Sequence, residues 1–175
     1  MKILSIDQSL NCSGYCICES DNLNLIKCTF YKPKCVKSVE KNVKFFDKYV
    51  KSVEKMYKIC IFFNQVIQEE NIDLVLLEDV QSQLSIKTFK LLSMLLGALI
   101  EVVNENQCEY MIIPPATWRK ILNPKKGMKR KELKELSKQY VRDRFNLEVN
   151  DDVADSICML CYFIENHEGE QQCNH

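Results

Sequence analysis

Glycine, proline and net charge are all scarce in this chain, and each scarcity excludes a class of protein. The 175 residues include only four glycines and four prolines, and the glycines are not clustered. The chain therefore lacks the glycine-rich loop with which many proteins hold nucleotide phosphates. Acidic and basic residues balance at 24 each, so no overall charge attracts a polyanion. The longest apolar stretch, residues 91–103, contains Ser93 and Glu101 and is too short to span a membrane.

Cysteine is abundant by contrast, with ten residues. The chain starts on a strand pattern rather than on the basic and then apolar segments of a secretory signal, so we expect an intracellular, cytoplasmic protein with reduced thiols. Only residues 12–18 and 158–161 hold closely spaced cysteines, and these do not form the matched pairs of a structural zinc site. Mostly buried thiols are the expectation.

The hydrophobic pattern predicts an α/β protein. Short apolar runs predict strands at residues 2–7, 14–19, 23–30, 72–78 and 109–113, with a hairpin turn at 20–22. Helical spacing predicts helices at 36–70, 85–105, 131–145 and 151–165, with a short helical turn around Trp118. This order indicates a five-stranded mixed sheet with helices on both faces. We expect one domain over residues 1–168 and a flexible tail at 169–175.

The first predicted helix carries two rows of side chains with helical spacing. Its apolar row comprises Val39, Val43, Phe46, Val50, Val53, Tyr57 and Cys60. Its lysine row, at residues 37, 41, 44, 48, 51, 55 and 58, runs two positions earlier, which is about 200° of helix rotation. We therefore expect the apolar row to face the core and the lysine row to face solvent, with DNA contact as the alternative for the lysines.

Four carboxylates occupy positions that suggest a metal site. Asp7 ends the first predicted strand and Glu78 the fourth, while Asp152 and Asp155 share one face at the start of the last helix. Acids beside buried strands are costly unless a cation pairs with them, so a divalent metal and phosphoryl chemistry are indicated. For the helix pair alone, the alternative is structural, with Asp152 as the N-cap and Asp155 as its capping-box partner.

Positive charge is concentrated in one region despite the neutral total. Residues 114–146 contain eleven lysines and arginines against three acidic residues, which favours contact with a polyanion. A solvated loop is the alternative for this charge run. The residues that we expect to contact phosphate are Lys125, Lys126, Lys129, Arg130 and Lys131. Trp118 has two interpretations, stacking on a base or burial in the core.

Several segments around these acids resemble RuvC-type Holliday junction resolvases, a ribonuclease H-like group often carried by phages of Gram-positive bacteria. The resemblance runs through nearly the whole chain in the family's order. Its blocks are IDQSL at 6–10 with SG at 13–14, LEDVQ at 77–81 with KTFK at 87–90 and LLG at 95–97, PPATWR at 114–119, and DDVADS at 151–156.

The resemblance implies an endonuclease that cuts four-way DNA junctions symmetrically as a homodimer, with the apolar 85–105 helix as a candidate interface. It also implies two Mg²⁺ ions, for which Mn²⁺ is a candidate substitute, held by Asp7, Glu78, Asp152 and Asp155.

Basic residues after the fifth strand are implied to assist at the scissile phosphate. Arg119 stands where the family usually has lysine, and either Lys129 or Lys131 is the second, with Lys131 taken as the candidate. Gln81 and Gln83 are further candidates for DNA contact. The chain departs from the family between Asp79 and Lys87, where it has no aromatic residue to wedge open a junction.

Other functions use some of the same features. A different ribonuclease H-like nuclease, acting on flaps, RNA–DNA hybrids or RNA, would need the same four acids. An actin-like ATP-binding protein also begins with an aspartate after its first strand, but the missing glycine-rich loops exclude it. A DNA-binding protein with a degenerate site would not retain all four acids, and a zinc or redox protein would show tightly held zinc.

Overall fold

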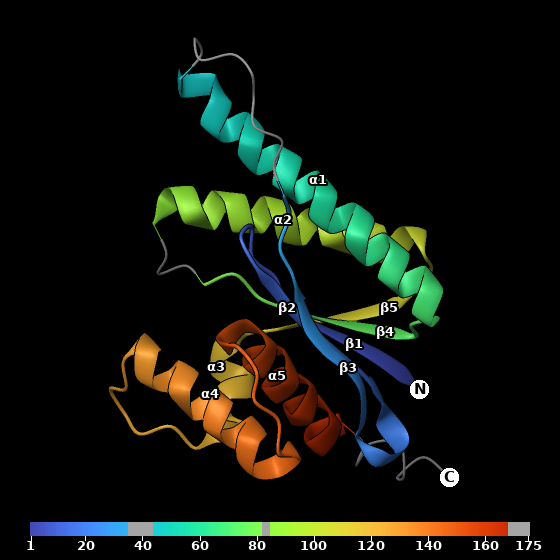
Figure 1. Cartoon of the computed structure of the whole chain (residues 1–175), viewed down its shortest axis with the longest axis vertical. Helices are drawn as coiled ribbons and strands as arrows, with labels where there is room; N and C mark the ends of the chain where they lie inside the picture. The colour runs from blue at the N-terminus through green and yellow to red at the C-terminus, as the bar shows by residue number, and fades with distance from the viewer. Residues whose placement is uncertain (35–43, 82–84, 168–175) are drawn as a thin grey trace.

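A five-stranded sheet lies between two layers of helices in the computed structural model, which describes residues 1–34, 44–81 and 85–167 (Figure 1). The strands are β1 Lys2–Asp7, β2 Ser13–Glu19, β3 Asn24–Tyr31, β4 Leu74–Glu78 and β5 Glu109–Ile113. The helices are α1 Lys44–Glu70, α2 Ile86–Glu105, α3 Pro115–Trp118, α4 Arg130–Phe145 and α5 Asp151–His167, with 3₁₀ turns η1 Ser20–Asn22 and η2 Arg119–Leu122. The predicted α/β order of elements is confirmed, and each predicted strand agrees with the structure to within two residues.

The sheet is mixed, with strand order β3-β2-β1-β4-β5. Strands β1, β2 and β3 form an antiparallel meander, and β1, β4 and β5 pair in parallel. Because parallel strands end at the same edge of a sheet, the residues that follow β1, β4 and β5 emerge side by side. This edge is where the two strand-end acids, Asp7 and Glu78, lie.

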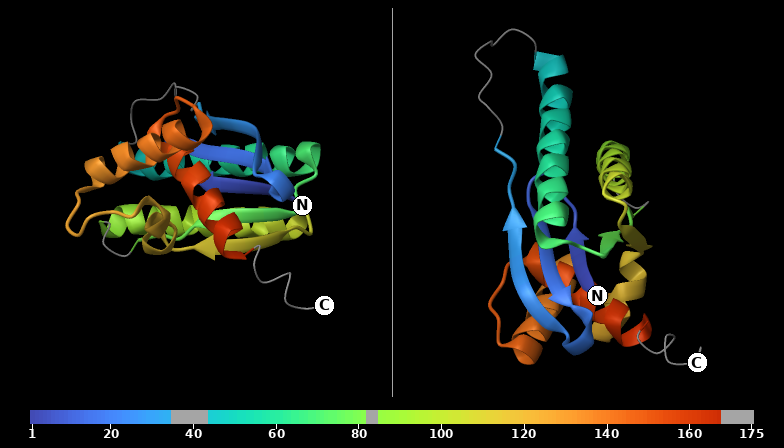
Figure 2. Two further views of the ribbon diagram at one scale, coloured as in Figure 1. Left: turned by 90° about the horizontal axis from the view of Figure 1, so that it is seen from below. Right: turned by 90° about the vertical axis from the view of Figure 1, so that its right-hand side faces the viewer.

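Alternate residues of each central strand face opposite layers of helices, as the period of two requires. In β1, Leu4 and Ile6 pack with α1 and α2, whereas Ile3 packs with α5 on the other face. The views in Figure 2 show α1 and α2 side by side on one face and α4 and α5 on the other. Helices on both faces are thus confirmed.

The expected orientation of the first helix is wrong. Its core-facing residues are Met56, Ile59, Phe63, Val66 and Ile67. Val50, Val53 and Tyr57 of the expected core row are exposed at 58%, 47% and 67%. Both rows have helical spacing, so periodicity alone could not show which one faces the sheet. Residues 36–43 of that predicted helix lie outside the described residues.

Three further features bear on the sequence expectations. None of the eight described cysteines forms a disulfide, and four of them are buried: Cys16, Cys18, Cys158 and Cys161. Within the described ranges, no helix combines the length and the apolar character needed to cross a membrane. The expected tail at 169–175 lies outside the described residues.

Helix α5 packs closely against β1 and β2, and this contact delivers its two acids to the sheet edge. The Ser5 hydroxyl of β1 donates a hydrogen bond to the Ser156 carbonyl of α5 at 2.8 Å. Gly14 of β2, opposite Asp7 in the sheet, lies against the first turn of α5. A Cβ atom at Gly14 would lie 2.1 Å from the carbonyl carbon and oxygen of Asp152. Only glycine permits this approach of strand to helix.

Substituting Gly14 with alanine tests how closely the site depends on this contact. The added methyl group must push the start of α5 away from the sheet, and we expect it to cost about 3 kcal/mol of stability, at the upper end of overpacking effects. Gly97→Ala is the matched control, because a Cβ atom there meets nothing within 4 Å. That variant should be at least as stable as the wild type, since alanine favours helix over glycine. Equal unfolding free energies for the two variants in denaturant titrations would contradict the interpretation.

Candidate active site

Strand periodicity and parallel pairing together bring Asp7 and Glu78 to one place. Ile6 of β1 is the register partner of Leu77 of β4, so the two acids follow at the same level of the sheet. Asp7 continues the face of β1 that carries Ile3, and Glu78 continues the equivalent face of β4. Both carboxylates therefore project toward α5 and line one cavity of about 40 Å³.

Three neighbours hold Glu78 in position. The Gln8 side chain is buried and bridges β1 to β4: its amide N–H donates to the Glu78 carbonyl, and its oxygen accepts from the Glu78 N–H at 3.2 Å. The indole Nε1 of Trp118 donates to Glu78 Oε1 at 2.9 Å, and Arg119 Nη2 lies 3.7 Å from the same oxygen. Trp118 is fully buried, which confirms its interpretation as a core residue.

The first turn of α5 carries the other two acids. Asn150 caps this helix, because its side-chain oxygen accepts from the Val153 N–H at 2.9 Å. The alternative in which Asp152 is the N-cap is therefore wrong, and its carboxylate is available for another role. Asp155 is buried and lines the same cavity as Asp7 and Glu78, whereas Asp152 lines the larger cleft next to it.

Lys134 of α4 is the basic residue in closest contact with the helix pair. Its ammonium lies 3.2 Å from Asp152 Oδ1 and 3.4 Å from Asp151 Oδ2, and it also lines the small cavity. Burial lowers the pKa of Lys134, but the negative charges of Asp152, Asp155 and Asp151 outweigh burial and hold that pKa above its usual value. The ammonium is thus kept charged by the acids that surround it.

Burial and mutual repulsion dominate the electrostatics of the acids. Burial, and then the negative charges of Glu78, Asp155 and Asp152, raise the pKa of Asp7 well above its usual value. Burial raises the pKa of Glu78 to about 7, although Arg119 and the Trp118 indole oppose the rise. Burial also raises the pKa of Asp155, against the effects of Ser137 and Lys134. The basic residues around the acidic cluster therefore do not fully compensate its negative charge.

The donor chemistry of these acids suits a divalent cation of the Mg²⁺ type. The donors are carboxylate oxygens, which Mg²⁺ prefers, and a cation would relieve the repulsion that raises the pKa of Asp7. In the part of the chain that the structure describes, no three histidine, cysteine or acidic side chains are gathered as closely as a bound ion requires. Instead, Arg119 pairs with Glu78 and Lys134 pairs with Asp152, so these two carboxylates have protein cations as partners.

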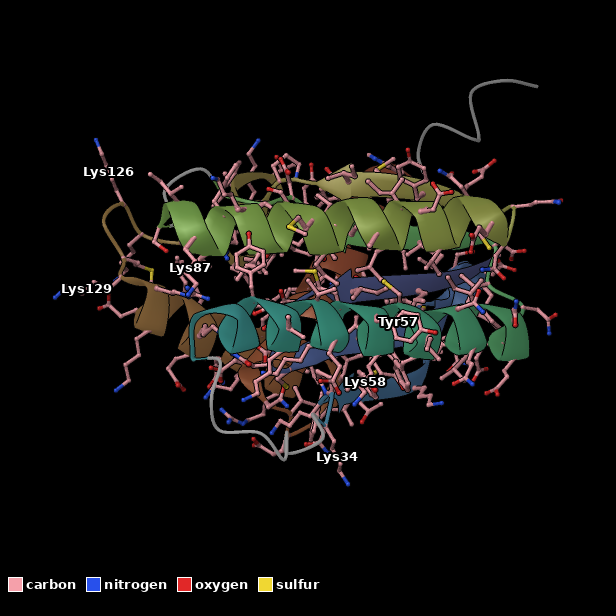
Figure 3. All side chains as sticks on the ribbon, turned by 90° about the horizontal axis from the view of Figure 1, so that it is seen from above. Lys34, Tyr57, Lys58, Lys87, Lys126 and Lys129 are labelled. Carbon is pink, nitrogen blue, oxygen red and sulfur yellow. The ribbon has the colours of Figure 1, made fainter. Side chains whose placement is uncertain are left out.

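The structure brings only some of the expected basic residues to the acids. Arg119 and Arg130 line the small cavity with Asp7, whereas Lys131 faces a separate surface depression beside Glu135. Lys125 lines another depression, next to Arg119. Figure 3 shows Lys126 and Lys129 pointing outward at one end of the molecule.

A cleft of about 860 Å³ adjoins the small cavity and extends toward α1 and α2. Asp7, Glu78 and Asp152 lie in it, together with Lys51 and Lys55 of α1. Two lysines of the predicted row therefore border the cleft, whereas Lys58 of the same row pairs with Glu54. Further cleft residues are Gln81, Lys87, Thr88, Arg119 and Arg130. Gln83, the other glutamine expected to contact DNA, lies outside the described residues.

Sequence reasoning did not identify Gln8, Lys134 or Ser137 as site residues. A signal for Lys134 was present, because it follows Arg130 by four residues on one helix and so shares its face, whereas Lys131 is rotated by about 100°. Gln8 and Ser137 carry no such signal. Their roles depend on contacts to residues far away in sequence, or on packing between α4 and α5.

No protein-family model matches the chain, and no curated protein matches it. Solved structures do. Thermus thermophilus RuvC in complex with a Holliday junction substrate matches with a TM-score of 0.69 and 14% identity, over 95% of this chain and 97% of that one. Fowlpox virus resolvase, in complex with Holliday junction DNA, matches with a TM-score of 0.56 and 17% identity, over 94% and 97%. The yeast mitochondrial Holliday junction resolvase matches with a TM-score of 0.53 and 15% identity, over 97% and 83%.

These matches confirm the expected fold class, the ribonuclease H-like α/β fold in the form that RuvC has. Each match covers at least 94% of this chain, so its sheet and both helix layers belong to the shared architecture. At 14–17% identity, the likeness concerns the fold.

The raised pKa of Glu78 predicts how the metal-free protein responds to pH. Between its ordinary value of 4.5 and about 7, folded Glu78 keeps a proton that unfolded Glu78 has lost. Stability should therefore fall as pH rises through this window, and Asp7 should add to the fall. Thermal unfolding in chelator at a series of pH values measures this. Glu78→Gln, which stays neutral, should flatten the profile, whereas Glu105→Gln at the exposed end of α2 should not. If Glu78→Gln shows the same dependence of stability on pH as the wild type, Glu78 is not the group with the raised pKa.

Proposed function

We propose that this chain is a structure-specific endonuclease that resolves four-way DNA junctions by metal-assisted hydrolysis of phosphodiester bonds. One observation carries the proposal: Asp7, Glu78 and Asp155 meet Arg119 and Arg130 in one cavity, at the strand-end edge of this fold. Two structures that share the fold were solved with Holliday junctions, which supports four-way DNA as the substrate.

The residues that would hold the metals are Asp7, Glu78, Asp152 and Asp155. Two Mg²⁺ ions, when bound, would activate a water molecule and stabilise the leaving 3′ oxygen. Gln8 and Trp118 orient Glu78 through their hydrogen bonds, so this carboxylate does not depend on a flexible loop for its position. Asp155 is fixed by its burial in α5.

Arg119 and Arg130 are suited to bind the scissile phosphate. Each presents a permanently charged guanidinium to the cavity that the acids line, and a guanidinium can contact two phosphate oxygens at once. We assign this role to Arg130 in place of Lys131, because Arg130 lines the cavity of the acids and Lys131 lines a separate depression. The two arginines come from η2 and α4, so phosphate binding and the metal ligands rest on different elements.

The cleft offers a path for the DNA backbone beyond the scissile phosphate. Lys51 and Lys55 border it on α1, and Lys87 borders it at the beginning of α2. Figure 3 shows Lys87 at the same end of the molecule as Lys126 and Lys129. Contacts from such residues to phosphates position DNA without reading its sequence. The exposed lysines Lys125, Lys126 and Lys129 would extend this surface to the arms of a junction.

Replacing Asp7 with asparagine tests the proposed chemistry. The variant should lose cutting of end-labelled four-way junctions in Mg²⁺ by roughly a hundredfold or more, because a charged group that acts at the reaction centre is removed. It should still bind the junction in gel-shift assays. Asp143→Asn, at an exposed position of α4, is the control and should cut normally.

The substrates in that assay separate the alternatives. Paired, symmetric nicks in the junction by the wild type support a resolvase. Preferential cutting of flaps, RNA–DNA hybrids or RNA would support the acidic site as catalytic but would contradict the four-way junction as the substrate. If the wild type cuts none of these in Mg²⁺ or Mn²⁺, a DNA-binding protein without catalysis is the better description.

The outer surface of α1 and α2 is suited to join two copies of the chain. Both helices expose large apolar side chains there: Tyr49, Val50, Val53, Tyr57 and Ile61 on α1, and Ile86, Phe89 and Met94 on α2. Figure 3 looks onto this side, with Tyr57 turned away from the sheet. A junction has two-fold symmetry and needs two matched nicks, so a second copy of the chain is the partner that we propose. The interface includes α1 as well as the expected 85–105 helix.

Placing a charge in this surface should separate the copies. Val53→Asp should weaken association by about 2 kcal/mol or more, because an uncompensated carboxylate would be buried in the contact. Sedimentation velocity at a series of protein concentrations measures the change. Leu147→Asp, at a position of similar exposure between α4 and α5, is the control and should leave association unchanged. A monomeric wild type, or a Val53→Asp variant that still dimerises normally, would overturn this interface.

A further inference from the structure

Lys134 occupies a place among the acids that the proposed metal ions would need. Its ammonium lies 3.2 Å from Asp152 Oδ1, a distance typical of a direct ion pair. It also lines the small cavity together with Asp7, Glu78 and Asp155. Lys134 is therefore the one described lysine that both pairs with a proposed metal ligand and faces the cavity of the other three.

The charge of Lys134 has opposite effects in the two states of the site. Without a metal, four carboxylates lie close enough for Glu78, Asp155 and Asp152 each to act on Asp7, and a nearby ammonium reduces that repulsion. With a metal, the same ammonium would repel a dication and would compete for Asp152. The interaction between a dication and a single charge is strong at such separations, even with substantial solvent screening.

We propose that Lys134 is a built-in counter-cation of the acidic cluster, which neutralises part of its charge when no metal is bound and which a divalent cation displaces from Asp152. This inference rests on the proposed function, because it takes Asp152 as a metal ligand. Lys134 acts here as a positioning residue: it acts on the metal through Asp152 and takes no part in bond breaking.

The position of Lys134 allows such a displacement. Its side chain is 22% exposed, and it reaches Asp152 from α4, so the ammonium can swing away without moving α5. Asp151 offers a second partner at 3.4 Å, which can keep the ammonium after it leaves Asp152. Arg119 and Arg130 line the same cavity, and neither forms an ion pair with Asp152 among the described contacts. The exchange at Asp152 therefore changes the partner of one lysine and involves neither arginine.

The test measures binding of Mn²⁺ to the whole chain without DNA. The EPR signal of free Mn²⁺ reports how much of the ion remains unbound. Lys134→Met removes the charge and keeps most of the side-chain length, and it should bind Mn²⁺ roughly three- to tenfold more tightly than the wild type. Its midpoint of thermal unfolding in chelator should be lower than that of the wild type, and the rise on adding Mn²⁺ should be larger. Lys134→Arg keeps the charge and should resemble the wild type in both measurements.

Lys138→Met is the matched control, because it removes an equal charge from the same helix. Lys138 lies 3.6 Å from Asp151 but forms no ion pair with Asp152 among the described contacts. It should therefore alter Mn²⁺ affinity much less than Lys134→Met does. An equal effect from both variants would show that total charge, and not displacement from Asp152, sets the affinity, and would overturn the inference.

The remaining outcomes separate this inference from the proposed function. If the wild type binds Mn²⁺ and Lys134→Met binds it equally or more weakly, the inference is wrong and the metal site stands. If the wild type neither binds Mn²⁺ nor gains thermal stability from it, the proposed metal site and this inference fail together. Neither result depends on DNA cleavage, so the choice of DNA substrate does not affect the test.

Discussion

The parallel pairing of β1 with β4 is the interaction on which the site depends. The register between Ile6 and Leu77 brings the two strand ends to one level, and the period of two then turns Asp7 and Glu78 toward the same face. A slip of one residue in either strand would move its acid to the face of α1 and α2. The buried core residues on both faces oppose such a slip, so the hydrophobic pattern that specifies the sheet also positions the acids.

Helix α5 completes the site because of two small groups in the sheet. Gly14 lets the backbone of α5 approach β2, and the Ser5 hydroxyl satisfies a carbonyl of that helix. Asn150 takes the N-cap position, so the Asp152 carboxylate is not needed as the cap and pairs with Lys134 instead. The stability of α5 and the placement of its acids thus depend on different residues. Substitutions can therefore displace the acids while the helix still forms, whereas loss of the helix would also remove the acids from the site.

Much of this was predictable from sequence, and the errors have clear physical origins. The order of elements follows from the strand and helix patterns, and the approach of Asp7 to Glu78 follows from where parallel strands end. The prediction of which side of α1 faces the core was wrong. The exposed row through Val53 and the buried row through Met56 are both apolar at helical spacing, so the spacing does not distinguish them. The second basic residue was sought at Lys129 or Lys131, whereas Arg130 lines the cavity of the acids, because the start of α4 sets which side chain turns inward and sequence places a helix start only to within a residue or two. The role of Gln8 depends on a contact across seventy residues, which no local pattern encodes.

The neutral charge of the chain conceals a separation that matters for binding a polyanion. Acids are concentrated inside the site, while Lys51, Lys55 and Lys87 border the cleft around it. Without divalent cations, a phosphate that enters the cleft meets attraction at its edge and repulsion at its centre. Cations bound at the centre would reverse that repulsion and leave positive charge throughout the cleft. Under the proposed function, close approach of the DNA backbone to the acids and occupation of the metal site are therefore coupled, and the total charge of the sequence is a poor guide to this affinity.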